Sequence, residues 1–205
     1  GAMVAVIMMG FAHGSSMLDP QITPLVPVLK SYWLIVHVAI IVSSYGFFGL
    51  SAVLAFFSLI IMMIKPNKKI EISLKEMTYV AEMSLTIGIY LLTVGTFLGG
   101  MWANESWGRY WSWDPKETWA FVSVIVYAVV LHMRLVPGLR GKYAFNVAAM
   151  WAIWAIVMTY FGVNYYLSGL HSYAAGDPIP VPMWVPATAI GMFILSLAAW
   201  YLQNK

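Results

Sequence analysis

The most unusual stretch of the sequence is residues 102–119, where five tryptophans alternate with charged side chains. Tryptophan favours the membrane–water interface, and an aromatic belt of that kind accounts for one or two of them. The whole set is suited to a flat apolar ligand such as a porphyrin, whose faces can stack on indole rings. Arg109 and Lys116 could meet the propionates of such a ligand. The alternative is that both pair with Asp114 or Glu117. The tryptophans are Trp102, Trp107, Trp111, Trp113 and Trp119.

Two of the four histidines are expected at the same depth as this tryptophan-rich stretch. His37 lies in the first turns of one apolar run, and His171 follows directly after another. Two neutral imidazoles at one level can supply both axial ligands of a haem iron. Taken singly, each would more commonly be a hydrogen-bonded histidine at the membrane surface. Their shared level favours the ligand interpretation, whereas His13 is expected to be an ordinary loop residue.

The remaining histidine, His132, has a different position. It falls about 14 residues into a third apolar run, or roughly 20 Å below the outer surface at 1.5 Å per residue. An ionisable group at such a depth is costly and is a functional candidate by default. The alternative is a neutral imidazole that donates a hydrogen bond to a neighbouring helix.

The sequence contains no cysteine, which excludes disulfides, thiolate metal sites and iron–sulfur clusters. Any thioether bond to haem must therefore use thiols of another protein. Two histidine ligands would hold the haem while its vinyl edge stays open to that protein, so catalysis would consist mostly of positioning. Asp114 and Glu117 could donate protons to the vinyl groups, or they could serve only to pair with Lys116 and to keep the loop soluble.

These residues are carried by a chain that is 61% apolar and 9% charged. Such a composition excludes a disordered chain and a nucleic-acid-binding protein. A helix needs about 20 mainly apolar residues to cross a bilayer, and five stretches qualify. We therefore predict an all-α, polytopic transmembrane helix bundle that forms a single domain over residues 1–205. Its outward-facing Trp-rich loop, residues 103–118, is expected to contain a short interfacial helix. The predicted spans are residues 32–64, 83–102, 119–135, 144–167 and 183–202.

The basic residues indicate the orientation of these spans, because Lys and Arg are retained on the cytoplasmic side of a membrane. Eight of the 11 lie on one side, whereas Lys30, Arg109 and Lys116 lie on the other. The Trp-rich loop, His37 and His171 are therefore expected outside. This side is the periplasm if the membrane is a bacterial inner membrane, or the lumen if it is a thylakoid membrane. The eight residues are Lys65, Lys68, Lys69, Lys75, Arg134, Arg140, Lys142 and Lys205.

The segment Trp-Gly-Arg-Tyr-Trp-Ser-Trp-Asp-Pro-Lys-Glu-Thr-Trp, residues 107–119, resembles the WWD signature of the cytochrome c assembly family. This family of haem-handling membrane proteins includes the CcsA/ResC proteins of system II and the CcmC and CcmF proteins of system I. The segments around His37 and His171 are similar to those that carry the two external histidines of CcsA. The segment Leu-His-Met-Arg at residues 131–134 is similar to the one that carries its membrane-embedded histidine. The ending Asp-Pro-Lys-Glu-Thr-Trp favours the CcsA branch over CcmC.

The resemblance implies a role in cytochrome c biogenesis, with haem transport across the membrane. His132 would hold haem b in transit, opposite a histidine of a CcsB/ResB-type partner or of a fused CcsB portion. At the outer face, His37 and His171 would ligate the iron while the protein acts as a haem lyase, or holocytochrome c synthase. Thioether bonds would then join the haem vinyl groups to an apocytochrome c with a Cys-X-X-Cys-His motif, which a thioredoxin-like protein keeps reduced. Cofactor contacts are assigned to Trp107, Trp111, Trp113, Trp119, Arg109 and Lys116, and a catalytic role to His37, His171 and Asp114.

The helices that precede this region in the family are missing, so we expect an N-terminally truncated C-terminal fragment. A fused CcsBA protein is one candidate for its parent.

The sequence leaves other functions open. The main alternative function is a CcmC-like module that hands haem to a chaperone without ligating it. A redox subunit would need facing histidine pairs within the membrane, and here only His132 is deep. A small-solute transporter is the weakest alternative, because the spans contain only this one deep ionisable residue.

Overall fold

The structure is a computed structural model that describes residues 6, 10, 30–64, 67–171 and 180–203. It divides into two compact units, Gly1–Ser31 and Tyr32–Lys205, and the second contains the helices considered below. All regular structure within the described ranges is helical, which confirms the predicted all-α class. The elements are α2 (Tyr32–Met62), α3 (Lys68–Trp107), α4 (Pro115–His132), η2 (Met133–Leu135), α5 (Lys142–Trp151), α6 (Ile153–Val157), η3 (Met158–Gly162), α7 (Val163–Tyr166) and α8 (Trp184–Gln203).

Five helical segments are long and apolar enough to cross a membrane, and the protein is an integral membrane protein. The fourth of them combines α5, α6 and α7, and η3 within it is a π-helical turn. Such turns interrupt the regular hydrogen-bond ladder of a helix and are common near functional sites. The five segments are Tyr32–Met62, Lys68–Trp107, Pro115–Leu135, Lys142–Tyr166 and Trp184–Gln203.

Helix α3 is 40 residues long and extends well beyond the predicted span 83–102. Its first part is rich in Lys and Glu, which lower the hydropathy but are good helix formers. Asn67 caps its N-terminus with a side-chain hydrogen bond. At the other end the helix continues to Trp107 and stops at Gly108, whose φ of 70° is left-handed. The helical part of the Trp-rich stretch is therefore the end of α3 and not a separate short helix, and the loop proper is residues 108–114.

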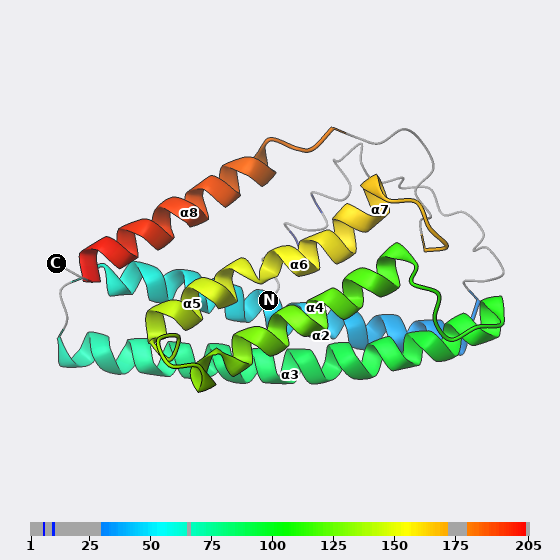
Figure 1. Ribbon diagram of the computed structural model, residues 1–205, viewed down its shortest axis with the longest axis horizontal. Helices are drawn as coiled ribbons and strands as arrows, with labels where there is room; N and C mark the ends of the chain where they lie inside the picture. Colours follow the sequence, from blue (N-terminus) through cyan, green and yellow to red (C-terminus); the bar gives the residue numbers. More distant parts are fainter. Residues whose placement is uncertain (1–5, 7–9, 11–29, 65–66, 172–179, 204–205) are drawn as a thin grey trace. The chain divides into compact units, whose positions relative to one another are not determined.

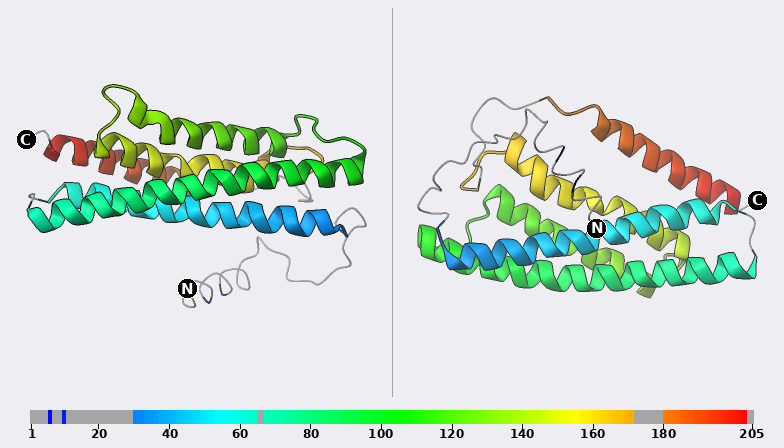
Figure 2. Two further views of the ribbon diagram at one scale, coloured as in Figure 1. Left: turned by 90° about the horizontal axis from the view of Figure 1, so that it is seen from below. Right: turned by 180° about the vertical axis from the view of Figure 1, so that it is seen from behind.

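Helices α2 and α3 lie side by side along most of their length (Figure 1, Figure 2). Small residues permit this close approach, as is common between membrane helices. A Cβ atom on Gly88 would lie 2.7 Å from the ring of Phe48, and one on Gly95 would lie 2.8 Å from Ile41. Helix α2 also buries three serines in this unit. They are Ser44, Ser51 and Ser58.

Helix α4 packs against α3, α6 and η3. Its Tyr127 stacks on Phe48 of α2, with the ring centroids 3.7 Å apart. The hydroxyl of Thr159 in η3 lies 2.9 Å from the Ser123 hydroxyl and donates to the Trp119 carbonyl at 3.1 Å. These contacts bring the start of α2, the end of α3, the start of α4 and the end of α7 to one end of this unit (Figure 1).

Helix α8 packs against α2 and α5. The hydroxyl of Tyr143 donates to the Ser196 carbonyl at 2.9 Å, and the Trp151 indole donates to the Ser196 hydroxyl at 3.3 Å. Most of the other side chains of α8 are exposed and apolar, among them Phe193, Ile194 and Leu197. Such a surface suits contact with lipid.

Candidate functional site

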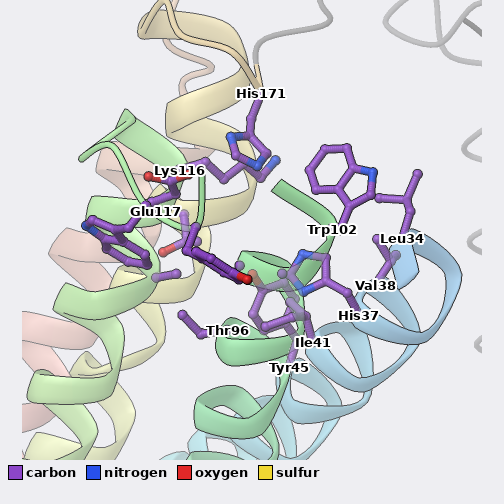
Figure 3. A pocket seen from close by; sticks show the side chains of 16 residues that line it. Leu34, His37, Val38, Ile41, Tyr45, Thr96, Trp102, Lys116, Glu117 and His171 are labelled. Carbon is purple, nitrogen blue, oxygen red and sulfur yellow. The ribbon is translucent and has the colours of Figure 1, made fainter. Parts of the chain in front are cut away.

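A cavity of about 170 Å³ lies at one end of this unit, where the start of α2, the end of α3 and the start of α4 meet the segment that follows α7 (Figure 3). The structure brings His37 of α2 and His171, which follows α7, to this same cavity. Aliphatic side chains of α2 line one side of it, and the Trp-rich loop and α4 contribute to the rest. Its polar and aromatic lining residues are His37, Tyr45, Thr96, Trp102, Tyr110, Trp111, Lys116, Glu117, Thr159 and His171.

His37 is held against α3 by a hydrogen bond and by a close steric fit. Its Nδ1 atom lies 2.7 Å from the carbonyl oxygen of Gly95. A carbonyl can only accept, so Nδ1 carries the hydrogen and Nε2 keeps a free lone pair. A Cβ atom on Gly99 would lie 2.5 Å from Cε1 of this ring, so only glycine at that position leaves it room. His37 therefore offers one unprotonated ring nitrogen.

His171 is also held through its Nδ1 atom, in this case by the carboxylate of Asp114. Its Nδ1 atom lies 2.8 Å from Oδ2 of Asp114, whose other oxygen accepts the backbone N–H of Leu170 at 2.6 Å. Asp114 is also the N-cap of α4, where it accepts the N–H of Lys116 at 3.2 Å. The carboxylate thus ties His171 to the start of α4 and leaves Nε2 of the imidazole available.

The protonation states of this pair follow from burial and hydrogen bonding. Burial lowers the pKa of the His171 imidazole below its ordinary value, and the hydrogen bond and charge of Asp114 only partly offset that effect. Burial by itself would raise the pKa of the Asp114 carboxyl, but hydrogen bonds from His171 and from two backbone N–H groups outweigh it, and the pKa is lowered. At neutral pH, His171 is neutral and Asp114 is ionised. Asp114 is therefore suited to accepting hydrogen bonds.

Trp102 connects the two histidines, although the sequence did not single it out from the other tryptophans. It is 1% exposed, and its ring lies 6.4 Å from the His37 ring and 5.5 Å from the His171 ring, measured between centroids. Trp107 packs on both Trp102 and His171, with ring centroids 4.7 Å and 5.0 Å away. The signal for Trp102 was its spacing, because it follows Gly95 by two helical turns and so shares its face of α3.

Glu117 organises the Trp-rich loop. Its carboxylate accepts hydrogen bonds from Arg109 Nη1 at 3.0 Å, from the Ser112 N–H at 2.8 Å and from the Asp114 N–H at 3.3 Å. The Arg109 guanidinium also lies over the Trp107 ring, 5.3 Å from its centroid. Arg109 thus pairs with Glu117, which is one of the alternatives that the sequence left open.

Replacing Glu117 with Ala is expected to lower the free energy of unfolding by about 3 kcal/mol, because three donors lose their shared acceptor in a buried site. The measurement is thermal or denaturant unfolding in detergent, followed by tryptophan fluorescence. Glu76→Ala, at an exposed position of α3, is the control and should stay near the wild type. Equal stability of the two variants would contradict the role assigned to Glu117.

Lys116 and the remaining tryptophans differ in their relation to the cavity. Lys116 lines it, and its ammonium group donates to Asn164 Oδ1 at 2.7 Å. Trp111 also lines it and packs edge-to-face on Trp113. Trp113 is 66% exposed, has a left-handed φ of 62° and does not line the cavity. Neither do Trp107, Trp119 and Arg109, so only part of the predicted contact set surrounds the cavity itself.

His132 is separate from this site. It is the last residue of the 18-residue helix α4, which spans about 27 Å. Its side chain is exposed, and its Nδ1 lies 2.7 Å from the Ala128 carbonyl of the same helix. The structure therefore places it at the opposite end of α4, further from the loop than the sequence estimate. His13 lies outside the described residues.

The donor set fits a haem iron better than a bare metal ion. Among residues 30–64, 67–171 and 180–203, no three His, Cys, Asp or Glu side chains form a cluster that could hold a metal. A porphyrin supplies four nitrogens itself, so its iron needs only two axial ligands, and two free Nε2 atoms meet that need. The cavity is smaller than the ~300–1,000 Å³ typical of pockets that enclose a small molecule. It would therefore hold part of a porphyrin, with the remainder projecting.

Comparisons with known proteins agree with these features. The sequence profile described as Cytochrome C assembly protein matches residues 1–171. Protein NrfI of Wolinella succinogenes is 49% identical over 95% of the chain, which covers 22% of NrfI. Cytochrome c biogenesis protein CcsA of Chlamydomonas reinhardtii is 39% identical over 75% of the chain, and that of Prochlorococcus marinus is 32% identical over 84%. The chain covers 44% and 64% of these two proteins, so it spans only part of the relatives it matches. By the profile match and these relatives, the chain belongs to the cytochrome c assembly protein family.

Proposed function

We propose that the protein binds haem b in the cavity between His37 and His171 and takes part in its covalent attachment to an apocytochrome c. The observation that carries this proposal is the pair of imidazoles at one cavity, each engaged through Nδ1 and each with Nε2 available. Relatives named cytochrome c biogenesis protein support the same pathway. Family membership by itself supports a role in cytochrome c assembly. The proposal adds that haem binds at this particular cavity.

In this proposal the residues of the chain bind and orient the haem substrate and do not react with it. His37 and His171 hold the iron through Nε2, and Trp111 packs along the porphyrin. Lys116 lies at the cavity, where it can meet a propionate. Since the chain has no cysteine, the thiols come from the apocytochrome. Each thiol adds across one vinyl group, with its sulfur bonding to the inner carbon and a proton to the terminal carbon, without net electron transfer.

The charge distribution supports an outward position for the cavity. The opposite ends of the same helices carry basic residues, which are retained on the cytoplasmic side. The cavity would then face the periplasm of a bacterial inner membrane, or the lumen of a thylakoid. The described basic residues at the opposite end are Lys68, Lys69, Lys75, Arg134, Arg140 and Lys142.

His132 has a separate role in this proposal. It lies at the inner end of α4 with an exposed ring, where it can meet a group from another polypeptide. We assign it to holding haem during transit, together with a histidine of a CcsB/ResB-type partner or fused portion. A thioredoxin-like protein would supply the apocytochrome with reduced cysteines.

Co-expression tests the proposed function directly. The protein, produced with a CcsB/ResB-type partner and an apocytochrome c in a host without another cytochrome c ligase, should yield cytochrome with covalent haem. Haem staining after denaturing electrophoresis measures this product, and an apocytochrome with both motif cysteines replaced by serine is the control. Haem that stays with the protein but is never attached would instead indicate a CcmC-like delivery module. A preparation that binds no haem would refute the haem site.

A further inference from the structure

The two histidines of the cavity differ in what their Nδ1 hydrogens contact. His37 donates to a neutral backbone carbonyl, that of Gly95. His171 donates to the carboxylate of Asp114, at 2.8 Å. A hydrogen bond to an anion is stronger and moves electron density onto the imidazole, which makes the ring a better donor to a metal. The chain therefore offers two unequal imidazoles.

The surroundings of Asp114 hold its carboxylate in one orientation. Its side chain is 4% exposed, and both oxygens are engaged, Oδ1 by the Leu170 N–H and Oδ2 by His171 and the Lys116 N–H. Gly169 permits this contact, because a Cβ atom there would lie 2.3 Å from Oδ1 of Asp114. The carboxylate is thus held by the Lys116 N–H of α4 and by Leu170 and His171, which follow α7.

The neighbouring cations direct their hydrogen bonds to other side chains. Lys116 directs its ammonium group to Asn164, and Arg109 pairs with Glu117. Among the described residues, the ionisable side chain that hydrogen-bonds to Asp114 is the neutral imidazole of His171. The side-chain hydrogen bond of this carboxylate is therefore the one with His171.

We propose that Asp114 is a positioning residue that directs Nε2 of His171 into the cavity and makes His171 the stronger electron donor of the two axial ligands. The inference rests on the proposed haem site. A stronger donor stabilises ferric over ferrous iron, so it lowers the reduction potential of bound haem. His37, with its carbonyl partner, is the weaker donor.

The variant Asp114→Asn tests this role, because Asn keeps the size of the side chain and its capping ability but removes the charge. The reduction potential of haem bound to the purified protein should become more positive by about 59 mV, which is a tenfold change in the one-electron equilibrium. Haem retention should fall by up to about tenfold, which is no more than the loss expected on removing the ligand itself. Glu105→Gln, which removes a charge at the exposed end of α3, is the control and should leave the potential unchanged. An unchanged potential and unchanged retention in Asp114→Asn would overturn the inference.

A second measurement does not depend on the folding of that variant. In His171→Ala, the empty position is filled with imidazole or with N-methylimidazole, and the potential of bound haem is compared. Imidazole can donate its N–H to Asp114, whereas N-methylimidazole cannot, so the imidazole form should have the lower potential. Equal potentials would refute the role of Asp114 while leaving the haem site intact. Failure of the wild-type protein to show a bis-imidazole haem spectrum would refute the proposed function instead.

Discussion

Replacing His37 or His171 with Ala is expected to lower the haem retained by the purified protein by about tenfold or more, which is ~1.4 kcal/mol of binding free energy. Each substitution removes one of the two imidazoles at the cavity and leaves a space of about the size and shape of a free imidazole molecule. Added imidazole should enter that space and restore retention together with a low-spin bis-imidazole spectrum. The measurement is the ratio of haem to protein after size-exclusion chromatography, with and without imidazole.

Two neighbouring positions provide matched controls for these variants. Ile35 lies on the same end of α2 as His37, and Leu170 directly precedes His171, and neither lines the cavity. Ile35→Ala and Leu170→Ala should retain haem at the wild-type level. Wild-type retention in His37→Ala or in His171→Ala would exclude the substituted histidine from the ligand set.

A single methyl group at Gly99 is expected to have a comparable effect although it removes no ligand. In Gly99→Ala, the new Cβ would lie 2.5 Å from Cε1 and 2.8 Å from Nδ1 of His37, so the ring must turn away from Gly95. Misplacement of a ligand should lower haem retention roughly tenfold. Added imidazole should not restore retention, because the displaced ring still occupies the cavity. The same chromatography and spectra measure this outcome.

Gly46→Ala is the matched control, because a Cβ atom at Gly46 of α2 would have no neighbour within 4 Å. This variant should retain haem fully and should unfold at the wild-type temperature or slightly above it, since Ala favours helix over Gly. Full retention in Gly99→Ala would mean that the position of His37 seen here is not the one in which it binds.

The presence of the five helices could be predicted from local composition, but the residues at which the helices begin and end could not. The apolar runs that identify the five helices are properties of the sequence itself. Helix α3 begins at Lys68 rather than near residue 83, because charged residues form helix as readily as apolar ones once it leaves the membrane. Its continuation to Trp107 was missed because the tryptophans and charges there resemble a loop, and the stop signal is the single residue Gly108.

The candidate site was predicted in part. The sequence selected His37, His171 and Trp111, which all line the cavity, because their residue types suit haem and their depths agree. It did not assign Trp102, whose contacts with both histidines depend on the packing of α2 against α3. It also offered Asp114 as a proton donor, whereas the structure engages that carboxylate as an acceptor for His171.

By itself, the sequence determined that this is a helical membrane protein and which side chains could meet a flat, metal-containing ligand. Hydropathy and residue type are local properties of the sequence, so they can be assessed before the fold is known. The tertiary structure alone decided which nitrogen of each imidazole stays free, and that Asp114 and His171 touch. Those contacts join residues far apart in the chain, and they depend on how the ends of different helices pack together.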